Sequence, residues 1–74
     1  MTLNELKPGS KGRILGITES GAAALRLLDI GFTPGTVVYL RACAPCGDPL
    51  LIEIRRAAVI LRREEAACVV IAHA

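Results

Sequence analysis

The chain has 74 residues, of which 53% are hydrophobic and 22% are charged, and its formal net charge is +2. This length allows a single small domain over residues 1–74, and this composition excludes a disordered chain. A charge of +2 is too small to steer the chain to nucleic acid or to an anionic membrane.

The apolar segments are too short for a membrane protein. None approaches the roughly 18 residues of a membrane-spanning helix, and the first residues, MTLNELKPGSKGR, lack the apolar region of a signal peptide. We therefore expect a cytoplasmic protein that is not inserted in a membrane. Its cysteines, Cys43, Cys46 and Cys68, are then expected to be reduced thiols.

Two short elements are predicted at the start of the chain. Thr2 and Glu5 have the spacing of a capping box, which favours one helical turn over residues 2–6. Residues 12–18 are rich in β-forming side chains and predict a first strand, which Gly12 and Gly16 allow to bulge or to lie close to another backbone.

The strongest helix pattern covers residues 20–30. Ser20 is a suitable N-cap, and Arg26 and Asp29 are left on the solvent side, where they can form a weak ion pair. The remaining positions predict a broad apolar face made of Ala23, Ala24, Leu25, Leu27, Leu28 and Ile30.

The stretch LLDIGFTPGT, residues 27–36, predicts a tight connection from this helix to a strand. Gly31 falls at the position where a helix ends in a left-handed residue, and Leu27 and Phe32 then form the apolar contact of a Schellman motif. Residues 33–36 fit a type II turn, with Pro and Gly at its central positions.

The second half of the chain predicts four further strands. Residues 36–42 and 50–56 alternate between apolar and polar side chains, so we expect a hairpin with a loop at 43–49. Short strands are expected at 58–61 and 68–74, separated by a polar turn. The whole pattern predicts a mostly β fold, a small five-stranded barrel with one α-helix between strands 1 and 2.

Four motifs, in order along the chain, are similar to those of one family. They are L-x-x-L-x-x-G at Leu3, Leu6 and Gly9; L-x-x-x-G-x-x-P-G at Leu27, Gly31, Pro34 and Gly35; A-P-x-G-D-P at Ala44, Pro45, Gly47, Asp48 and Pro49; and L-R-x-x-E-A at Leu61, Arg62, Glu65 and Ala66. With these motifs the chain resembles FeoA, the small accessory protein of bacterial ferrous-iron uptake.

The resemblance implies a fold, a partner and a class of function. The fold is an SH3-like barrel, and the partner is FeoB, a membrane GTPase permease for Fe²⁺ that FeoA contacts on the cytosolic side. We find no catalytic constellation, so we expect a non-enzyme without a cofactor. Contact with the partner is expected through the 43–49 loop, at Pro45, Gly47, Asp48 and Pro49, and through the helix–strand cleft near Phe32.

The large apolar fraction also predicts an interaction surface. The interior of so small a barrel cannot hide every apolar side chain, and this spare surface would also allow a homodimer. The residues assigned to the outward face or to strand ends are Val37, Tyr39, Leu51, Ala57 and Ala58. The alternative is that these residues are scattered singly and have no role.

A metal-binding or metal-sensing protein is the alternative function. Cys43 and Cys46 form a C-x-x-C pair, and with Cys68 and His73 they would supply three thiolates and one imidazole. The simpler interpretation is two thiols in a hairpin loop, with Cys68 pointing into the barrel and His73 in solvent. Asp48 is expected to hydrogen-bond within its own turn.

Nucleic-acid binding is a weaker alternative. Arg55, Arg56, Arg62 and Arg63 would form a basic patch if the barrel brought them together. Base stacking requires aromatic side chains, and the chain has only Phe32 and Tyr39. We therefore expect no nucleic-acid partner.

Overall fold

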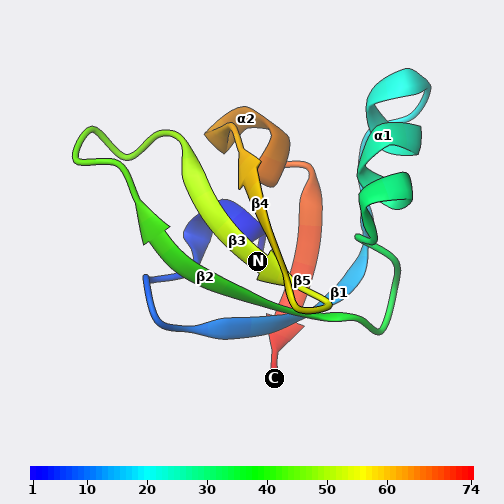
Figure 1. The fold of residues 1–74 in the computed structure, drawn as a ribbon. Coiled ribbons are helices and arrows are strands. Elements are labelled where there is room, and N and C mark those ends of the chain that lie inside the picture. The colour runs from blue at the N-terminus through cyan, green and yellow to red at the C-terminus, as the bar shows by residue number, and fades with distance from the viewer.

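Five antiparallel strands form one curved sheet, in the order β4-β3-β2-β1-β5, in the computed structural model, which describes residues 1–74. Three helical segments accompany the sheet, and the one between β1 and β2 is the longest (Figure 1). In chain order the elements are η1 (Leu3–Glu5), β1 (Lys11–Ile17), α1 (Ala22–Ile30), β2 (Val37–Cys43), β3 (Leu50–Ile54), β4 (Ala57–Leu61), α2 (Arg63–Ala66) and β5 (Val69–His73). The predicted fold class is confirmed.

The inside of the curved sheet is filled by one apolar cluster. Alternate residues of the strands point inward, as the period-two pattern predicts, and Phe32 from the α1–β2 connection is fully buried among them. The cluster holds 14 buried residues: Leu3, Leu6, Ile14, Leu27, Phe32, Val38, Leu40, Leu50, Ile52, Ile54, Leu61, Ala66, Val69 and Ile71.

The predicted cap at the end of α1 is present. Gly31 has φ +124°, the N–H of Phe32 donates to the carbonyl of Leu27 over 3.0 Å, and the N–H of Gly31 donates to the carbonyl of Leu28 over 3.0 Å. These are the two hydrogen bonds of a Schellman motif. The N–H of Thr36 donates to the carbonyl of Thr33 over 3.1 Å and closes the next turn.

Three predictions about α1 are wrong. The helix begins at Ala22, and Ser20 does not cap it, because Gly21 takes the N-cap position with φ +78°. Its buried side is narrower than expected: Ala24 and Leu27 are buried, whereas Leu25 and Leu28 are 62% and 38% exposed. Periodicity could not show this, because it tells which residues share a side of the helix but not how much of that side the barrel covers.

The third error concerns the charged residues of α1. Arg26 does not pair with Asp29 on its own helix but forms an ion pair with Glu65 on α2. Local spacing predicts neighbours on one helix, and this partner lies 39 residues away in the sequence. Neither α-helix of the structure is long and apolar enough to cross a membrane.

Candidate functional site

A cleft separates α1 from α2 on the outside of the barrel. It has a volume of about 340 Å³ and extends from the end of β1 across α1 to the end of α2. Its lining combines apolar side chains with three carboxylates and one thiol: Glu19, Ala23, Leu27, Glu64, Glu65 and Cys68.

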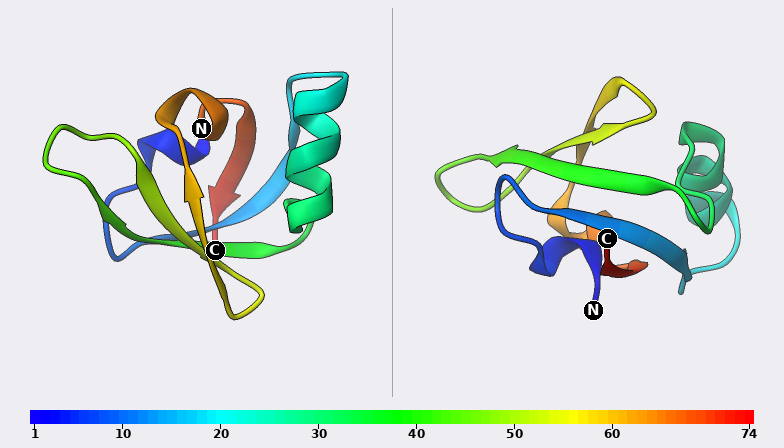
Figure 2. Two further views of the ribbon diagram at one scale, coloured as in Figure 1. Left: turned by 45° about the horizontal axis from the view of Figure 1, so that its top comes forward. Right: turned by 90° about the horizontal axis from the view of Figure 1, so that it is seen from below.

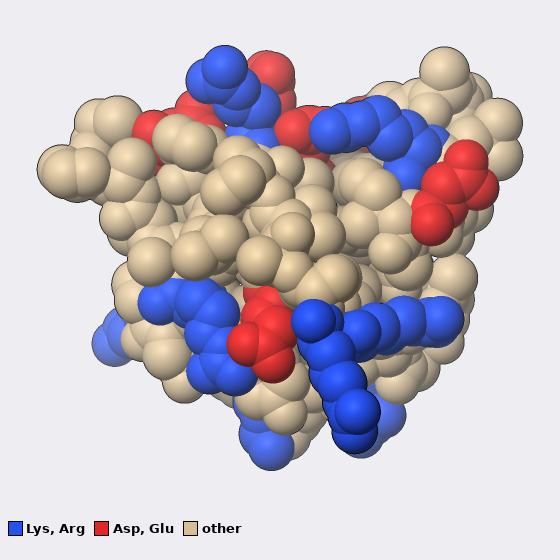
Figure 3. Space-filling model, in the orientation of Figure 1, with Lys and Arg blue, Asp and Glu red and all other residues tan.

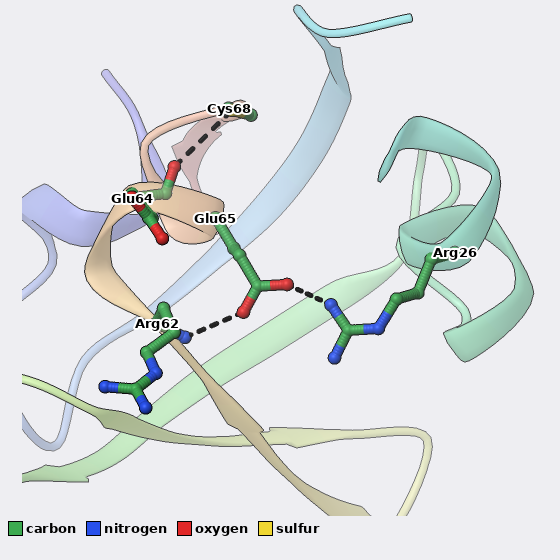
Figure 4. Close-up of polar contacts among 5 residues, drawn as sticks. All are labelled: Arg26, Arg62, Glu64, Glu65 and Cys68. Carbon is green, nitrogen blue, oxygen red and sulfur yellow. Dashed lines mark hydrogen bonds and ion pairs between the residues drawn. The ribbon is translucent and has the colours of Figure 1, made fainter. Parts of the chain in front are cut away.

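Glu65 bridges the two sides of this cleft. One carboxylate oxygen accepts from the Arg26 guanidinium of α1, and the other accepts from the backbone N–H of Arg62 over 3.0 Å (Figure 4). The hydrogen bond from the Arg62 backbone, together with Arg26, lowers the pKa of Glu65 below its usual range. Glu65 therefore holds α1 in place and satisfies a backbone donor at the start of α2.

Cys68 lies in the cleft, which corrects the expectation that it points into the barrel. It falls in the turn between α2 and β5, is half-buried, and its thiol donates to the carbonyl of Glu64 over 3.4 Å (Figure 4). Burial raises the pKa of the Cys68 thiol, and the negative charge of Glu19 raises it further. Both effects favour the protonated form of the thiol.

The largest exposed apolar side chains are not those predicted. Val37, Tyr39 and Leu51 are half-buried, and Ala57 and Ala58 are exposed but small. The large exposed ones are Met1, Leu15, Leu25, Leu28 and Ile60. Two of these five, Leu25 and Leu28, are three residues apart on α1 and therefore share one side of the helix.

The 43–49 loop is fixed to the barrel by Arg63. The backbone N–H of Arg63 donates to Asp48 Oδ1 over 2.9 Å, its Nε donates to the carbonyl of Gly47 over 2.7 Å, and its Nη1 donates to the carbonyl of Asn4 over 2.9 Å. Asp48 thus binds the first residue of α2, and the prediction that it bonds within its own turn is wrong. The turn is closed instead by the N–H of Gly47, which donates to the carbonyl of Ala44 over 2.7 Å.

The predicted contact residues do not form one surface. Pro45 is exposed, and Gly47, Asp48 and Pro49 are half-exposed in the loop, but Phe32 is 0% exposed and cannot touch a partner. Figures 1 and 2 also place the β2–β3 loop and α1 at opposite ends of the molecule. Phe32 therefore packs in the core beneath the end of α1.

The four candidate metal ligands are also dispersed. Cys43 is exposed at the end of β2 and Cys46 is exposed in the loop, where its thiol donates to the carbonyl of Asp48 over 3.0 Å. Cys68 lines the cleft, and His73 lies beside Met1 and Glu5 in a separate hollow. No three His, Cys, Asp or Glu side chains are grouped so that they could hold a metal ion.

The four arginines considered for a basic patch are split into two pairs. Arg55 and Arg56 form the turn before β4, whereas Arg62 and Arg63 follow its other end. Arg63 is also engaged in the contacts that hold the loop.

Comparison of the sequence with known proteins shows the family of the chain. Residues 1–73 match the model of the FeoA domain. The chain is 37% identical over 67 residues to the Fe(2+) transport protein A/Fe(2+) transporter FeoB fusion protein of Porphyromonas gingivalis. The match covers 90% of this chain and only 8% of the fusion protein.

Two solved structures, each with 33% sequence identity to this chain, show the same fold. Iron(II) transport protein A from Clostridium thermocellum superposes with a TM-score of 0.94 at 33% identity, over 99% of this chain and 45% of that one. FeoA of Stenotrophomonas maltophilia, a prokaryotic SH3 domain protein complexed with zinc, superposes with a TM-score of 0.88 at 33% identity, over 97% of this chain and 89% of that one. The predicted family and SH3-like fold are confirmed, and FeoA domains are non-catalytic accessory domains, as predicted.

Proposed function

Because the chain belongs to the FeoA domain family, we propose that it is a non-catalytic partner of a FeoB ferrous-iron permease and acts on the cytosolic side. One observation carries this proposal: in Porphyromonas gingivalis a similar sequence is joined to FeoB in one polypeptide. A fusion keeps two proteins within reach of each other at a high effective concentration, which is useful when they act together.

The contact that we propose first is the outward side of α1. Leu25 and Leu28 expose apolar surface there, and burying such side chains against a partner contributes about 25 cal/mol per Å². The ion pair between Arg26 and Glu65 fixes α1 against α2, so the helix is held in place before a partner arrives. The adjoining cleft can accept a partner side chain beside the helix.

The 43–49 loop is proposed as a second contact, through Pro45, Gly47, Asp48 and Pro49. Arg63 holds the backbone of this loop at Gly47 and Asp48. A loop that is already ordered loses little conformational entropy on binding.

Calorimetric titration against the cytosolic domain of FeoB from the same organism tests the proposal. We expect saturable binding by the wild-type chain, weakened at least about tenfold by the double change Leu25→Ser and Leu28→Ser. The matched control is Leu15→Ser with Ile60→Ser, because these side chains are similarly exposed, at 56% and 58%, but lie on β1 and β4. The control should bind like wild type.

Three results would count against the proposal or one of its parts. Absence of binding by the wild-type chain at high micromolar concentration would contradict the FeoB partnership itself. Equal weakening by the control pair would remove α1 as the contact. A loss of affinity in Pro45→Ala, with the α1 double variant unaffected, would assign the contact to the loop instead.

A further inference from the structure

Basic side chains gather on the outward side of β1 and β2. The register places Lys11 beside Tyr39 and Tyr39 beside Glu53, so these three side chains share one side of the sheet. Arg13 is two residues from Lys11 and lies on the same side. Arg41 lies over the ring of Tyr39 at 4.7 Å from its centroid and donates to Glu53 Oε1 over 2.7 Å.

Two further arginines extend this surface around the α1–β2 turn. Arg13 Nη1 donates to the carbonyl of Gly35 over 2.9 Å, and Arg55 Nη2 donates to Thr33 Oγ1 over 3.0 Å, so the same turn holds both guanidinium groups. Arg56 follows Arg55 in the β3–β4 turn and is exposed. We call the whole surface the basic face: Lys11, Arg13, Arg41, Arg55 and Arg56.

Most of the positive charge on this face is not neutralised. The two ion pairs of the structure are Arg26–Glu65 and Arg41–Glu53, so four of the five cations have no carboxylate partner. Figure 3 shows basic side chains around a small acidic area in the lower part of this view, whereas the upper part carries both signs. Three of the seven carboxylates line the α1–α2 cleft.

The net charge of +2 predicts no attraction to an anionic membrane. This expectation changes because the positive and negative side chains lie on different sides of the molecule. At physiological ionic strength a charge is screened beyond about 8 Å, so an apposed surface responds to the face turned toward it. We infer that the basic face lies against the anionic phospholipid headgroups of a membrane. The inference rests on the proposed function, because a FeoB partner would bring the chain to a membrane surface.

Lipid suits this face better than nucleic acid does. Single-stranded nucleic acid binds through bases stacked on exposed aromatic rings, but the ring of Tyr39 is covered by Arg41 and Phe32 is fully buried. Binding to an anionic membrane requires only several cations on one face of the protein. Each cation near the membrane surface strengthens binding about fivefold. The anionic headgroups would repel the carboxylates of the α1–α2 cleft, so the protein would bind with its basic face toward the membrane and the cleft away from it.

Vesicle co-sedimentation of the full chain tests this inference. We expect binding to phosphatidylcholine vesicles that contain about 30% phosphatidylglycerol, weak binding to pure phosphatidylcholine, and loss of binding when NaCl rises from about 50 to about 300 mM. The double change Lys11→Gln and Arg56→Gln should weaken binding about 25-fold. Neither side chain makes a hydrogen bond in the structure, so the fold should be retained.

The matched control removes the same charge from another side of the molecule. Arg26→Gln with Arg62→Gln changes residues at the α1–α2 cleft, and thermal unfolding confirms that each variant is folded. This control should bind vesicles within about twofold of wild type. Equal loss in both double variants, or no preference for anionic vesicles, would overturn the inference.

Two further measurements separate this inference from the FeoB proposal. Binding of the soluble FeoB domain, measured without vesicles, should be unchanged by Lys11→Gln with Arg56→Gln. If it is abolished, the basic face is a protein interface and the lipid inference fails. Tighter binding to a single-stranded oligonucleotide than to anionic vesicles at the same salt concentration would also overturn it.

Discussion

The backbone N–H of Arg63 and the carboxylate of Asp48 are joined by a 2.9 Å hydrogen bond, although the residues are 15 positions apart in the sequence. The guanidinium of Arg63 also donates to the carbonyls of Gly47 and Asn4. One side chain therefore holds the β2–β3 loop, the start of α2 and the N-terminal turn together.

Removal of the guanidinium should destabilise the fold. Arg63→Met leaves two partly buried carbonyls without a donor, and we expect the free energy of unfolding to fall by about 1–3 kcal/mol. Arg62→Met is the control, because that side chain is exposed, and it should change the free energy by less than about 0.5 kcal/mol. Urea unfolding measures both, and an unchanged stability of Arg63→Met would show that the loop is not held by these bonds.

Sequence reasoning predicted what depends on neighbouring residues. The Schellman cap follows from Leu27, Gly31 and Phe32, which are close in the chain. The strands β2 and β3 follow from the alternation of apolar side chains, and the other three follow from short runs of β-forming residues between turns. The Asp48–Arg63 and Arg26–Glu65 contacts depend on where the fold places distant segments. No local spacing distinguishes those partners from other charged residues.

The same limit applies to the candidate site. Helical spacing placed Leu25 and Leu28 in an apolar face but could not show that they lie away from the barrel. The basic face could not be predicted from the sequence, because the net charge does not tell where the charged side chains lie on the surface. Phe32 was assigned both to the cap and to partner contact, and its burial leaves only the first role.

Gly31 should tolerate no side chain without a cost in stability. Its φ of +124° is unfavourable for any residue with a Cβ, so Gly31→Ala is expected to lower the free energy of unfolding by about 1–2 kcal/mol. An added Cβ would lie 3.5 Å from Arg55 Cδ, an ordinary contact, so the cost comes from the backbone. Gly16→Ala is the control, because an added Cβ there meets open space and the φ is not positive, and it should leave the free energy of unfolding almost unchanged. Equal losses of free energy in the two variants, measured by chemical denaturation, would contradict the role of the positive φ at Gly31.

Glu65 should stabilise the protein in a pH-dependent way. Its pKa is lowered in the folded state, so its contribution is present above the unfolded pKa of about 4.3 and is lost as pH falls through the lower folded pKa. Glu65→Gln should therefore lose about 1 kcal/mol at neutral pH and converge with wild type in acid. Melting temperatures measured across this pH range check the sign. Glu64→Gln, at an exposed residue, is the control and should change the free energy of unfolding at neutral pH by less than about 0.5 kcal/mol.

The three thiols should differ in reactivity. Cys43, at the end of β2, and Cys46, in the loop, are exposed, whereas Cys68 is half-buried and its pKa is raised by burial and by Glu19. Alkylation with iodoacetamide near pH 8, followed by peptide mass spectrometry, should modify Cys68 at least about tenfold more slowly. Equal rates at all three positions would mean that the cleft opens readily in solution.

Amide chemical shifts of the isotope-labelled chain, recorded while the cytosolic domain of FeoB is added, test the proposed partnership most directly. We expect the largest changes in α1, from Ala22 to Ile30, and in the cleft residues Glu19, Glu64 and Cys68. Spectra that stay unchanged at high micromolar FeoB would contradict the partnership, and changes that avoid α1 and the cleft altogether would contradict α1 as its first contact.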